Sequence, residues 1–431
     1  MQRLSSSAPD FAKKFARLVE DRRETDIDVT QAVSTILGEI RARGDDALAE
    51  FTMRYDDFAL PQGEWRIDPE RCKAAFEALD PDLRDALTLA ADRIRSYHEA
   101  QLPKNRDYTD DAGIRLGARW SPVDAAGLYV PGGRASYPSS LLMNAIPAKV
   151  AGVKRLAICT PTPKGAINEL VLAAAHLAGV DEIWPVGGAQ AVGALAYGTS
   201  RIAAVDVVTG PGNAYVAEAK RQLYGVVGID MVAGPSEILV IADGKNDPDW
   251  IAADLLSQAE HDPSAQSILI TDDAGFADQV GDRVDVQLAM LATNRTAQAS
   301  WDQYGLIVVV GDLAKEAPGL ANALAAEHIE LAIDEPEKMF KHIRHAGSVF
   351  LGRMTPEAIG DYVAGPNHVL PTGRRARFSS GLSVLDFMKR TSFIAVGDEG
   401  LKAIGPAAVR LAEMEGLPAH AKSVQLRLKK S

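Results

Sequence analysis

The sequence predicts an α/β protein whose strands form parallel sheets in two blocks. Short, continuous apolar runs alternate with helical patterns from about residue 127 onward. This alternation is typical of strands that are buried on both faces by the helices between them. A second block of the same kind begins at Ser236. Glycine follows several of the runs, where a strand would turn into a helix.

Composition limits the functions to consider. The chain has 431 residues, of which 47% are hydrophobic and 24% charged, as in an ordinary globular enzyme of more than one domain. A net charge of −12 makes a nucleic-acid partner unexpected. We expect a cytoplasmic protein without a membrane span, because the sequence has no signal-peptide pattern or long apolar run. Its two cysteines, Cys72 and Cys159, exclude a disulfide framework.

The chain before residue 127 reads as helical. Residues 8–25 are predicted to form a short charged segment outside the main body, and residues 29–55 one long amphipathic helix. Two further helices are predicted to open at Asp68 and Asp80, each with an acidic N-cap followed by proline. His98, near the end of the second of these helices, is expected at the surface.

The later elements follow from the apolar runs. Strands of the first block are predicted at 128–130, 155–159, 182–186 and 204–208, with helices at 166–178, around Gln190 and at 214–223. Strands of the second block are predicted at 237–242, 267–271 and 306–310, with helices from Trp250, at 313–326 and at 335–345. A loop-rich stretch at 360–368 precedes a helix at 405–415 and a tail.

A pair of residues at the end of the helix from Trp250 is the first metal-site candidate. Gln258 and His261 stand three apart, so a helix would place an amide oxygen and an imidazole on one face. These are ligand types for zinc, although the same pair also fits a solvated helix end. His342 and His345 have the same spacing, but their basic neighbours disfavour a cation.

Other candidates carry phosphate or acid–base chemistry. Glycine turns at 131–133, 187–188 and 210–213 let the backbone approach a phosphate, although the G-x-G-x-x-G dinucleotide fingerprint is absent. Glu327 and His328 place a carboxylate beside an imidazole, which suits proton transfer but also suits two polar residues at a helix end. Asp361, His368 and His420 lie in loop or helix-end contexts, where functional residues are frequent.

A set of short motifs then identifies a resemblance. They are GLYVPGG at 127–133, GPGN at 210–213, AGPSE at 233–237, QAEH at 258–261, EHIEL at 327–331, GPNH at 365–368 and FSSGLS at 378–383. In this order they closely resemble the histidinol dehydrogenase family over nearly the whole chain. The resemblance implies oxidation of L-histidinol to L-histidine, the last step of histidine biosynthesis, with two NAD and one zinc per subunit.

The resemblance also implies site residues by position. Glu327 and His328 match the catalytic acid–base pair. The zinc ligands would be Gln258, His261, Asp361 and His420, with His420 supplied by the partner subunit. Tyr129, Gln190 and Asn213 match cofactor-binding positions. The substrate-binding positions would be Ser236, Gln258, His261, Glu327, His328, Asp361, His368, Glu415 and His420.

The family's fold gives the domain organisation we expect. It resembles that of aldehyde dehydrogenases, with two Rossmann-like parallel-sheet units and small helical appendages at both termini that intertwine in a homodimer. We therefore assign 1–25 to an N-terminal appendage and 382–431 to a C-terminal one. The ranges 26–127 and 236–381 would form a first α/β domain carrying most of the site, and 128–235 a second one carrying the NAD turns.

Two alternatives stay open at this stage. A metal-free aldehyde dehydrogenase would need Cys72 or Cys159 as its nucleophile, yet Cys159 ends an apolar strand, where a thiol usually behaves as a small hydrophobe. A non-enzymatic zinc-binding dimer of the same shape would not need the Glu327–His328 pair.

Overall fold

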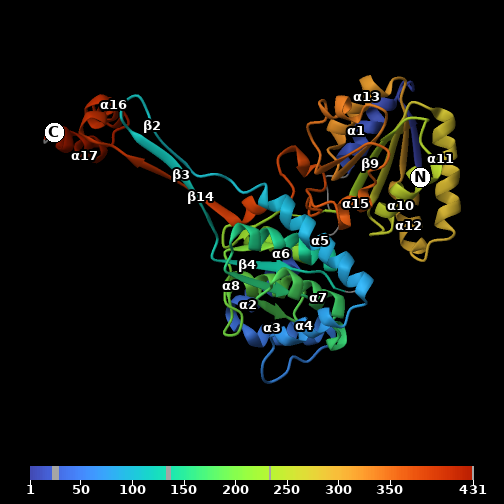
Figure 1. Cartoon of the computed structure of the whole chain (residues 1–431), viewed down its shortest axis with the longest axis horizontal. Coiled ribbons are helices and arrows are strands. Elements are labelled where there is room, and N and C mark those ends of the chain that lie inside the picture. The colour runs from blue at the N-terminus through green and yellow to red at the C-terminus, as the bar shows by residue number, and fades with distance from the viewer. Residues whose placement is uncertain (22–28, 133–136, 233, 430–431) are drawn as a thin grey trace.

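The computed structural model describes residues 1–21, 29–132, 137–232 and 234–429. It has two α/β bodies, one around a five-stranded and one around a six-stranded sheet, and a long arm that projects from the first body (Figure 1). Within the described residues, no helix is long and apolar enough to cross a membrane. The predicted class, α/β with two parallel-sheet units, is confirmed.

The five-stranded body is a parallel sheet in the order β6–β5–β4–β7–β8. Its strands are β4 (Ala125–Tyr129), β5 (Arg155–Cys159), β6 (Glu182–Trp184), β7 (Val207–Thr209) and β8 (Gly228–Ile229). The chain runs outward from β4 to β6 and then returns to the other side of β4 with β7. The order therefore reverses between β4 and β7, which is where open α/β sheets bind ligands, at the carboxyl ends of the strands.

Helices cover both faces of this sheet. Those on one face are α2 (Thr30–Arg43), α3 (Asp45–Asp56), α8 (Gly188–Tyr197) and α9 (Ala214–Leu223). Those on the other are α4 (Pro69–Glu77), α5 (Pro81–Glu99), α6 (Pro138–Ala151) and α7 (Glu169–Ala178). Of the range 26–127, the described residues 29–127 therefore pack mainly on the five-stranded sheet, and our grouping of them with 236–381 is wrong. Apolar stripes show that a helix is covered, but they do not say which sheet covers it.

Local signals in these helices were mostly sound. The side chains of Asp68 and Asp80 cap α4 and α5 by accepting from the backbone amides two residues later, as predicted. The single helix predicted at 29–55 is instead broken at Gly44, whose φ of +53° ends α2 and starts α3. His98 is fully buried, with Nδ1 2.7 Å from the carbonyl of Ile94, so its predicted surface position is wrong.

The six-stranded body has a parallel sheet in the order β1–β11–β10–β9–β12–β13. Its strands are β1 (Gln2–Ser5), β9 (Glu237–Ala242), β10 (Gln266–Thr271), β11 (Leu306–Val309), β12 (His328–Ala332) and β13 (Ser348–Leu351). Its helices are α1 (Phe11–Asp21), α10 (Pro248–Ala259), α11 (Ala274–Leu288), α12 (Asn294–Tyr304), α13 (Leu313–Leu324), α14 (Pro336–Phe340) and α15 (Glu357–Tyr362). The helix predicted at 335–345 is thus limited to the short α14.

The N-terminus belongs to this second body. β1 pairs in parallel with β11 as an edge strand, and Phe15 and Val19 of α1 are buried in the core. The N-terminal appendage predicted at 1–25 is therefore wrong for the described residues 1–21. Charged residues dominate α1 in sequence, but they occupy its solvent face, and two buried apolar side chains are enough to anchor it.

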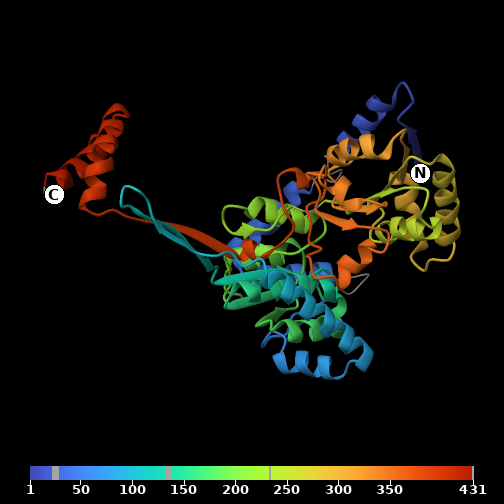
Figure 2. The ribbon, with the colours of Figure 1, turned by 45° about the horizontal axis from the view of Figure 1, so that its top comes forward.

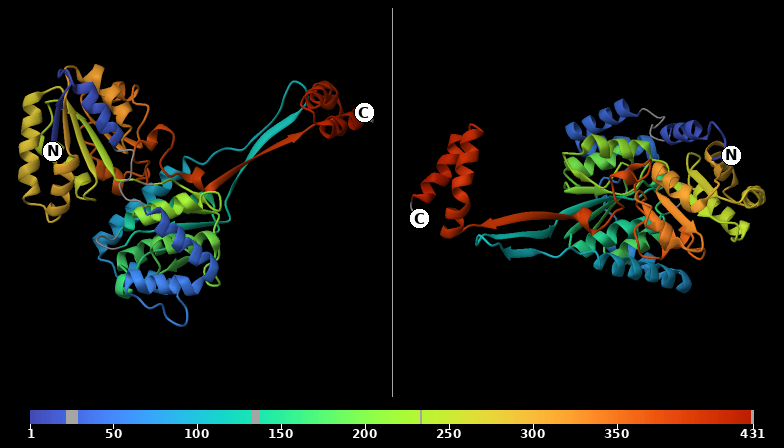
Figure 3. Two further views of the ribbon diagram at one scale, coloured as in Figure 1. Left: turned by 180° about the vertical axis from the view of Figure 1, so that it is seen from behind. Right: turned by 90° about the horizontal axis from the view of Figure 1, so that it is seen from above.

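The arm consists of a three-stranded antiparallel sheet and a helical tip. β3 (Arg115–Pro122) pairs with β2 (Arg106–Thr109) on one side and with β14 (Met388–Ala395) on the other. The tip consists of α16 (Asp398–Met414) and α17 (Pro418–Leu428), which pack on each other. Figures 2 and 3 show the tip held away from both bodies. Residues 106–122, which we placed in the first domain, thus share the arm with the C-terminal segment.

Candidate active site

The predicted acid–base pair lies at the amino edge of the six-stranded sheet. His328 begins β12, and β12 pairs directly with β9, which begins at Glu237. The sheet order reverses between these two strands. Open α/β sheets usually bind ligands at the carboxyl edge, so this site is on the opposite edge of its sheet from the expected one. α10 ends beside the same edge and brings Gln258 to it.

Glu327 is a buried carboxyl group held by the start of β9. Its Oε2 accepts a hydrogen bond of 3.0 Å from the amide of Glu237, and it also interacts with the hydroxyl of Ser236. Burial raises the pKa of Glu327 well above its usual range, and the charges of Glu237 and Asp361 add to this effect. Glu327 is therefore a buried carboxyl group whose protonated form is favoured and which contacts Ser236 and Glu237 at the start of β9.

His328 is a buried, neutral imidazole. Burial lowers the pKa of His328 to about 4, against the opposing effect of Asp361. Its Nδ1 lies 3.2 Å from the carbonyl oxygen of Glu237. A carbonyl only accepts, so Nδ1 carries the proton and Nε2 has the free lone pair. Nε2 is buried, has no hydrogen-bond partner among the described residues, and lies 3.8 Å from Oδ1 of Asp361.

The predicted metal ligands of the body lie at this edge of the sheet, with Asp361 beside the lone pair. Oε1 of Gln258 is buried and accepts no hydrogen bond from the described part of the chain. His261 follows α10 and, with Asp361, acts electrostatically on both His328 and His368. An unsatisfied amide oxygen, an imidazole and a carboxylate are a donor set that suits zinc. These residues therefore fit the metal that the sequence predicts.

The structure adds Glu357, which sequence analysis missed. Glu357, His328 and Asp361 have potential ligand atoms within 4.8 Å of one another. Oε1 of Glu357 lies 3.0 Å from Nδ1 of His328, and burial raises the pKa of Glu357 well above its usual range. Glu357 and Asp361 stand four apart on α15, which puts them on one helix face. That spacing was visible in the sequence and was the available signal.

Ser236 and His368, which are predicted to bind the substrate, also lie at this site. His368 contacts both bodies. Nδ1 of His368 lies 3.0 Å from the carbonyl oxygen of Asp361, and Nε2 lies 3.2 Å from Oγ of Ser140 on α6. Burial lowers the pKa of His368. Ser140 was not predicted, because nothing in its local sequence distinguishes it from other helix positions.

The predicted cofactor residues meet at the carboxyl edge of the five-stranded sheet. Tyr129 ends β4, and its hydroxyl accepts a 3.1 Å hydrogen bond from the amide of Gly188 at the start of α8. Gln190 is buried in the first turn of α8. Asn213 caps α9, with Oδ1 accepting from the amides of Tyr215 and Val216. The three residues flank the reversal between β4 and β7, and the N-termini of α8 and α9 there favour negative charge such as that of a phosphate.

Glycine is required at this edge for close packing. A Cβ on Gly210, whose φ is +112°, would lie 2.1 Å from the carbonyl oxygen of Tyr129. The turn at 210–213 therefore packs closely on the end of β4, and the phosphate-binding role predicted for the turns at 187–188 and 210–213 stays a prediction. Gly133, at the end of the first predicted turn, lies outside the described residues.

Glu415 and His420 are not brought to the site by their own chain. Glu415 is the C-cap of α16, and His420 is in the first turn of α17. Both are exposed at the tip of the arm, away from the two bodies (Figure 1). The tip also exposes large apolar side chains, namely Ile404, Leu411, Met414, Leu417 and Leu426. An apolar surface of this kind on a small two-helix unit is typical of an interface.

The cysteine-nucleophile alternative does not fit. Cys159 has no exposed surface and ends the buried strand β5, and Cys72 is buried in α4. Burial raises the pKa of both thiols, so both are protonated and unreactive at neutral pH. Neither residue is near His328 in the sheet arrangement, because both lie in the other body.

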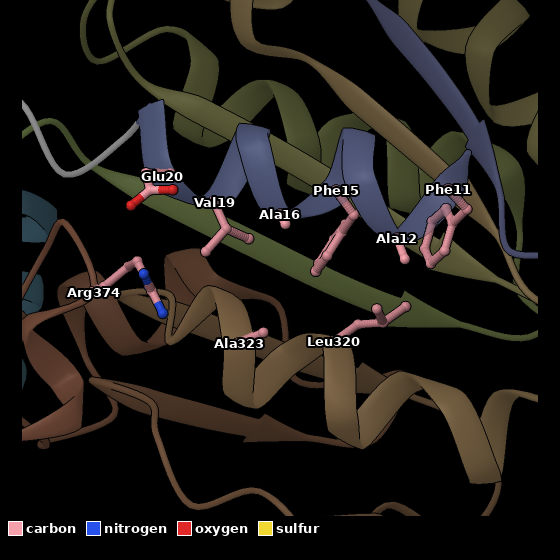
Figure 4. Close-up of a pocket in the computed structure, with 9 residues that line it drawn as sticks. All are labelled: Phe11, Ala12, Phe15, Ala16, Val19, Glu20, Leu320, Ala323 and Arg374. Carbon is pink, nitrogen blue, oxygen red and sulfur yellow. The ribbon is translucent and has the colours of Figure 1, made fainter.

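A shallow groove of about 390 Å³ between α1 and α13 is separate from this chemistry. Phe11, Phe15 and Leu320 line its apolar floor, and Glu20 and Arg374 stand at one end (Figure 4). None of the predicted site residues lines it. We assign it no catalytic role.

A second buried carboxyl pair near the site gives a stability prediction. Burial, with the neighbouring charge of Asp254, raises the pKa of Glu330 to about 9. An unfolded glutamate titrates at about 4.3. Between these values the folded chain keeps a proton that the unfolded chain releases, so stability falls as pH rises through this interval.

Glu330→Gln keeps a donor toward Asp254 but cannot release a proton. We expect its free energy of unfolding to fall less steeply between about pH 5 and pH 9 than that of the wild type. Urea unfolding at several pH values and one protein concentration measures both slopes. Equal slopes would show that Glu330 does not hold its proton in the folded state.

Comparison with known proteins gives one family. The histidinol dehydrogenase family model matches residues 19–428. The histidinol dehydrogenases of Rhodospirillum rubrum and Zymomonas mobilis are 61% and 60% identical to this chain, over 99% of it and over 98% and 99% of their own lengths. A crystal structure of histidinol dehydrogenase from Elizabethkingia anophelis superposes with a TM-score of 0.94 at 36% identity, covering 100% of this chain and 98% of that one.

Proposed function

The chain belongs to the histidinol dehydrogenase family, and we propose that it oxidises L-histidinol to L-histidine in the cytoplasm, the last step of histidine biosynthesis. Two NAD would each accept one hydride, with L-histidinaldehyde bound between the two oxidations. One observation carries the proposal: a buried carboxyl group and a neutral imidazole with a free Nε2 face a cluster of nitrogen and oxygen donors. These groups can remove a proton from a bound alcohol.

We propose that His328 accepts the proton of the substrate hydroxyl group. At neutral pH its ring is uncharged, and Nε2 has a lone pair with no partner in the described part of the chain. In the first oxidation the O–H proton would move to Nε2 while the hydride leaves for NAD. After this proton has been released to water, the same nitrogen would take the proton of the hydrated aldehyde in the second oxidation, as the second hydride leaves for NAD.

We assign Glu327 to water activation in the second step. Attack of water on the aldehyde needs a base, and Glu327 is held by the amide of Glu237. A zinc ion held by Gln258, His261, Asp361 and the partner subunit's His420 would orient the substrate and, by its charge, favour the ionised form of nearby carboxyl groups. The NAD would lie at the turns around Tyr129, Gln190 and Asn213, so the two bodies would contribute different parts of one site.

We propose a homodimer with shared sites, and the position of the arm supports it. His420 and Glu415 are exposed at its tip, remote from the site in their own chain. A second copy related by twofold symmetry would offer each tip a body, which is the commonest way to close such an assembly. The exposed apolar residues of the tip support this arrangement.

An NADH absorbance assay with L-histidinol tests the reaction. We expect two NADH per histidine formed in the zinc-loaded protein. Absence of NADH formation with L-histidinol would refute the proposed function. It would leave the non-enzymatic zinc-binding dimer as the remaining reading.

The zinc assignment predicts that substitutions of the proposed ligands lower the zinc content, whereas substitutions of two other histidines do not. His261→Ala and Asp361→Ala should each lose zinc, because each removes a ligand of a site that needs four. His342→Ala and His345→Ala should keep it, because their histidines lie beyond α14 among basic residues. Elemental analysis of the purified, desalted proteins measures this. Full zinc in the first pair would refute the ligand assignment.

A further inference from the structure

Two oxygen atoms compete for the Nδ1 side of His328. The carbonyl oxygen of Glu237 lies 3.2 Å from Nδ1, and Oε1 of Glu357 lies 3.0 Å from it. Oε1 is buried and has no hydrogen bond of its own within the described residues. A small rotation of the ring would align the N–H with this oxygen. No role for Glu357 follows from the sequence motifs.

Glu357 is held so that this oxygen faces the ring. It is the first residue of α15 and is almost fully buried. Its other oxygen, Oε2, lies 3.3 Å from Oγ of Ser257, and the single hydroxyl proton of Ser257 is shared between Oε2 and the carbonyl oxygen of Asp254 in α10, which lies 2.8 Å from Oγ. The contact between α10 and α15 therefore fixes the carboxyl group, leaving Oε1 as its free end.

Three carboxyl groups lie near the His328 ring, and those of Glu357 and Glu327 are on the Nδ1 side, with Oε2 of Glu327 3.8 Å from that nitrogen. Glu357 lies beside Nδ1, whereas Asp361 lies 3.8 Å from Nε2. Among these three carboxyl groups, only Asp361 therefore lies on the side of the lone pair. Glu357 is therefore placed to accept a hydrogen bond from the ring, whereas Asp361 is placed to bind a metal.

We propose that Glu357 is a positioning residue, which holds His328 with its proton on Nδ1 and stabilises the imidazolium that forms when Nε2 takes the substrate proton. The inference rests on the proposed role of His328. The proton balance is simple. The substrate O–H bond breaks, an Nε2–H bond forms, the hydride leaves with its electron pair for NAD, and the Nδ1 proton stays in place toward Glu357. An acceptor behind an imidazole in this way fixes its tautomer and orientation.

The test compares two variants of Glu357 in the zinc-loaded dimer. Glu357→Leu removes the acceptor and keeps most of the volume. We expect its kcat to fall about 100-fold in both half-reactions, because a positioned imidazole serves both. The KM for L-histidinol and the zinc content should stay close to wild type. Glu357→Gln should keep kcat within about tenfold, because its amide oxygen can face Nδ1 while its NH2 donates to Ser257.

Glu330→Gln is the matched control. Glu330 of β12 is also buried, also has a raised pKa and acts electrostatically on Glu357, but its partner is Asp254 of α10, and no contact joins it to the His328 ring among the described interactions. Because its raised pKa favours the protonated, uncharged form at neutral pH, Gln keeps its charge. We expect its kcat to be unchanged, which separates loss of a carboxyl from loss of the one beside Nδ1. Ser257→Ala, which frees Oε2 only, should lower kcat by less than Glu357→Leu does.

The outcomes decide between roles. An unchanged kcat in Glu357→Leu overturns the inference, as does equal loss of kcat and zinc in Glu357→Leu and Glu357→Gln, which would make Glu357 a ligand. If Glu357→Leu does not fold, an unchanged kcat in Ser257→Ala overturns it. His328→Asn distinguishes failure of the proposed role of His328 from failure of the proposed role of Glu357. Turnover in His328→Asn would refute the role of His328. If His328→Asn is inactive and the Glu357 variants have normal kcat, only the role of Glu357 is refuted.

Discussion

Mixing inactive His420→Ala chains with inactive His261→Ala chains is expected to restore turnover. The reason is the arm, which carries His420 away from the site that contains His261 in the same chain. If the tip serves the partner, a heterodimer has one site with both lesions and one with neither. Random exchange of equal amounts would then return about a quarter of the wild-type sites of a twofold dimer.

The experiment has an internal control. Asp361 and His261 belong to the same body, so exchange of Asp361→Ala with His261→Ala chains leaves one lesion in every site and should give no activity. Heterodimers are verified by differently tagged chains. Verified heterodimers of the first pair that stay inactive would show that His420 serves its own subunit or is not a ligand, and the ligands in the body would be unaffected.

The local parts of the fold were predictable because their signals lie within a few residues. Aspartate followed by proline set the starts of α4 and α5, and each aspartate does cap its helix. Continuous apolar runs located β5 and β9 to within a residue. The break at Gly44 was missed, because a single glycine is tolerated inside many helices and only its positive φ shows the interruption.

The arrangement of these elements depended on contacts that are far apart in sequence. β14 pairs with β3, so that Thr391 lies opposite Arg119; β14 is largely exposed, β3 is mostly half-buried, and neither strand has a fully buried residue. Strands without a buried face have no alternating apolar pattern to read. The arm was therefore invisible in the sequence, and its two halves were placed in different domains.

The candidate site shows the same division. The resemblance supplied Glu327, His328 and the ligands as single positions, and the structure gathers those of the body at the starts of β9 and β12. The resemblance did not supply Glu357 of α15, which contacts Ser257 of α10 and His328 of β12. Burial was the other unpredictable property, since it is the main cause of the shifted pKa values of Glu327 and His328.

Glu327→Gln is expected to separate the two oxidations. The amide keeps the shape of the side chain but cannot remove a proton from water, so the aldehyde-to-acid step should slow by about 100- to 10,000-fold. The alcohol-to-aldehyde step, which we assign to His328, should change by less than about tenfold. The structure favours a clean comparison, because Glu327 accepts from the backbone of Glu237 and an amide oxygen can accept the same bond.

Single-turnover measurements distinguish the steps. With L-histidinol and excess NAD, the wild type should release two NADH per site in the first turnover, and Glu327→Gln should release the first at nearly the normal rate and the second slowly. L-histidinaldehyde supplied directly should be oxidised slowly by the variant. His328→Asn is the contrasting case, because loss of a base used in both steps should delay the first NADH as well. If Glu327→Gln slowed both steps by the same factor, Glu327 would not be the base that activates water, and its buried carboxyl would instead support the geometry of the whole site.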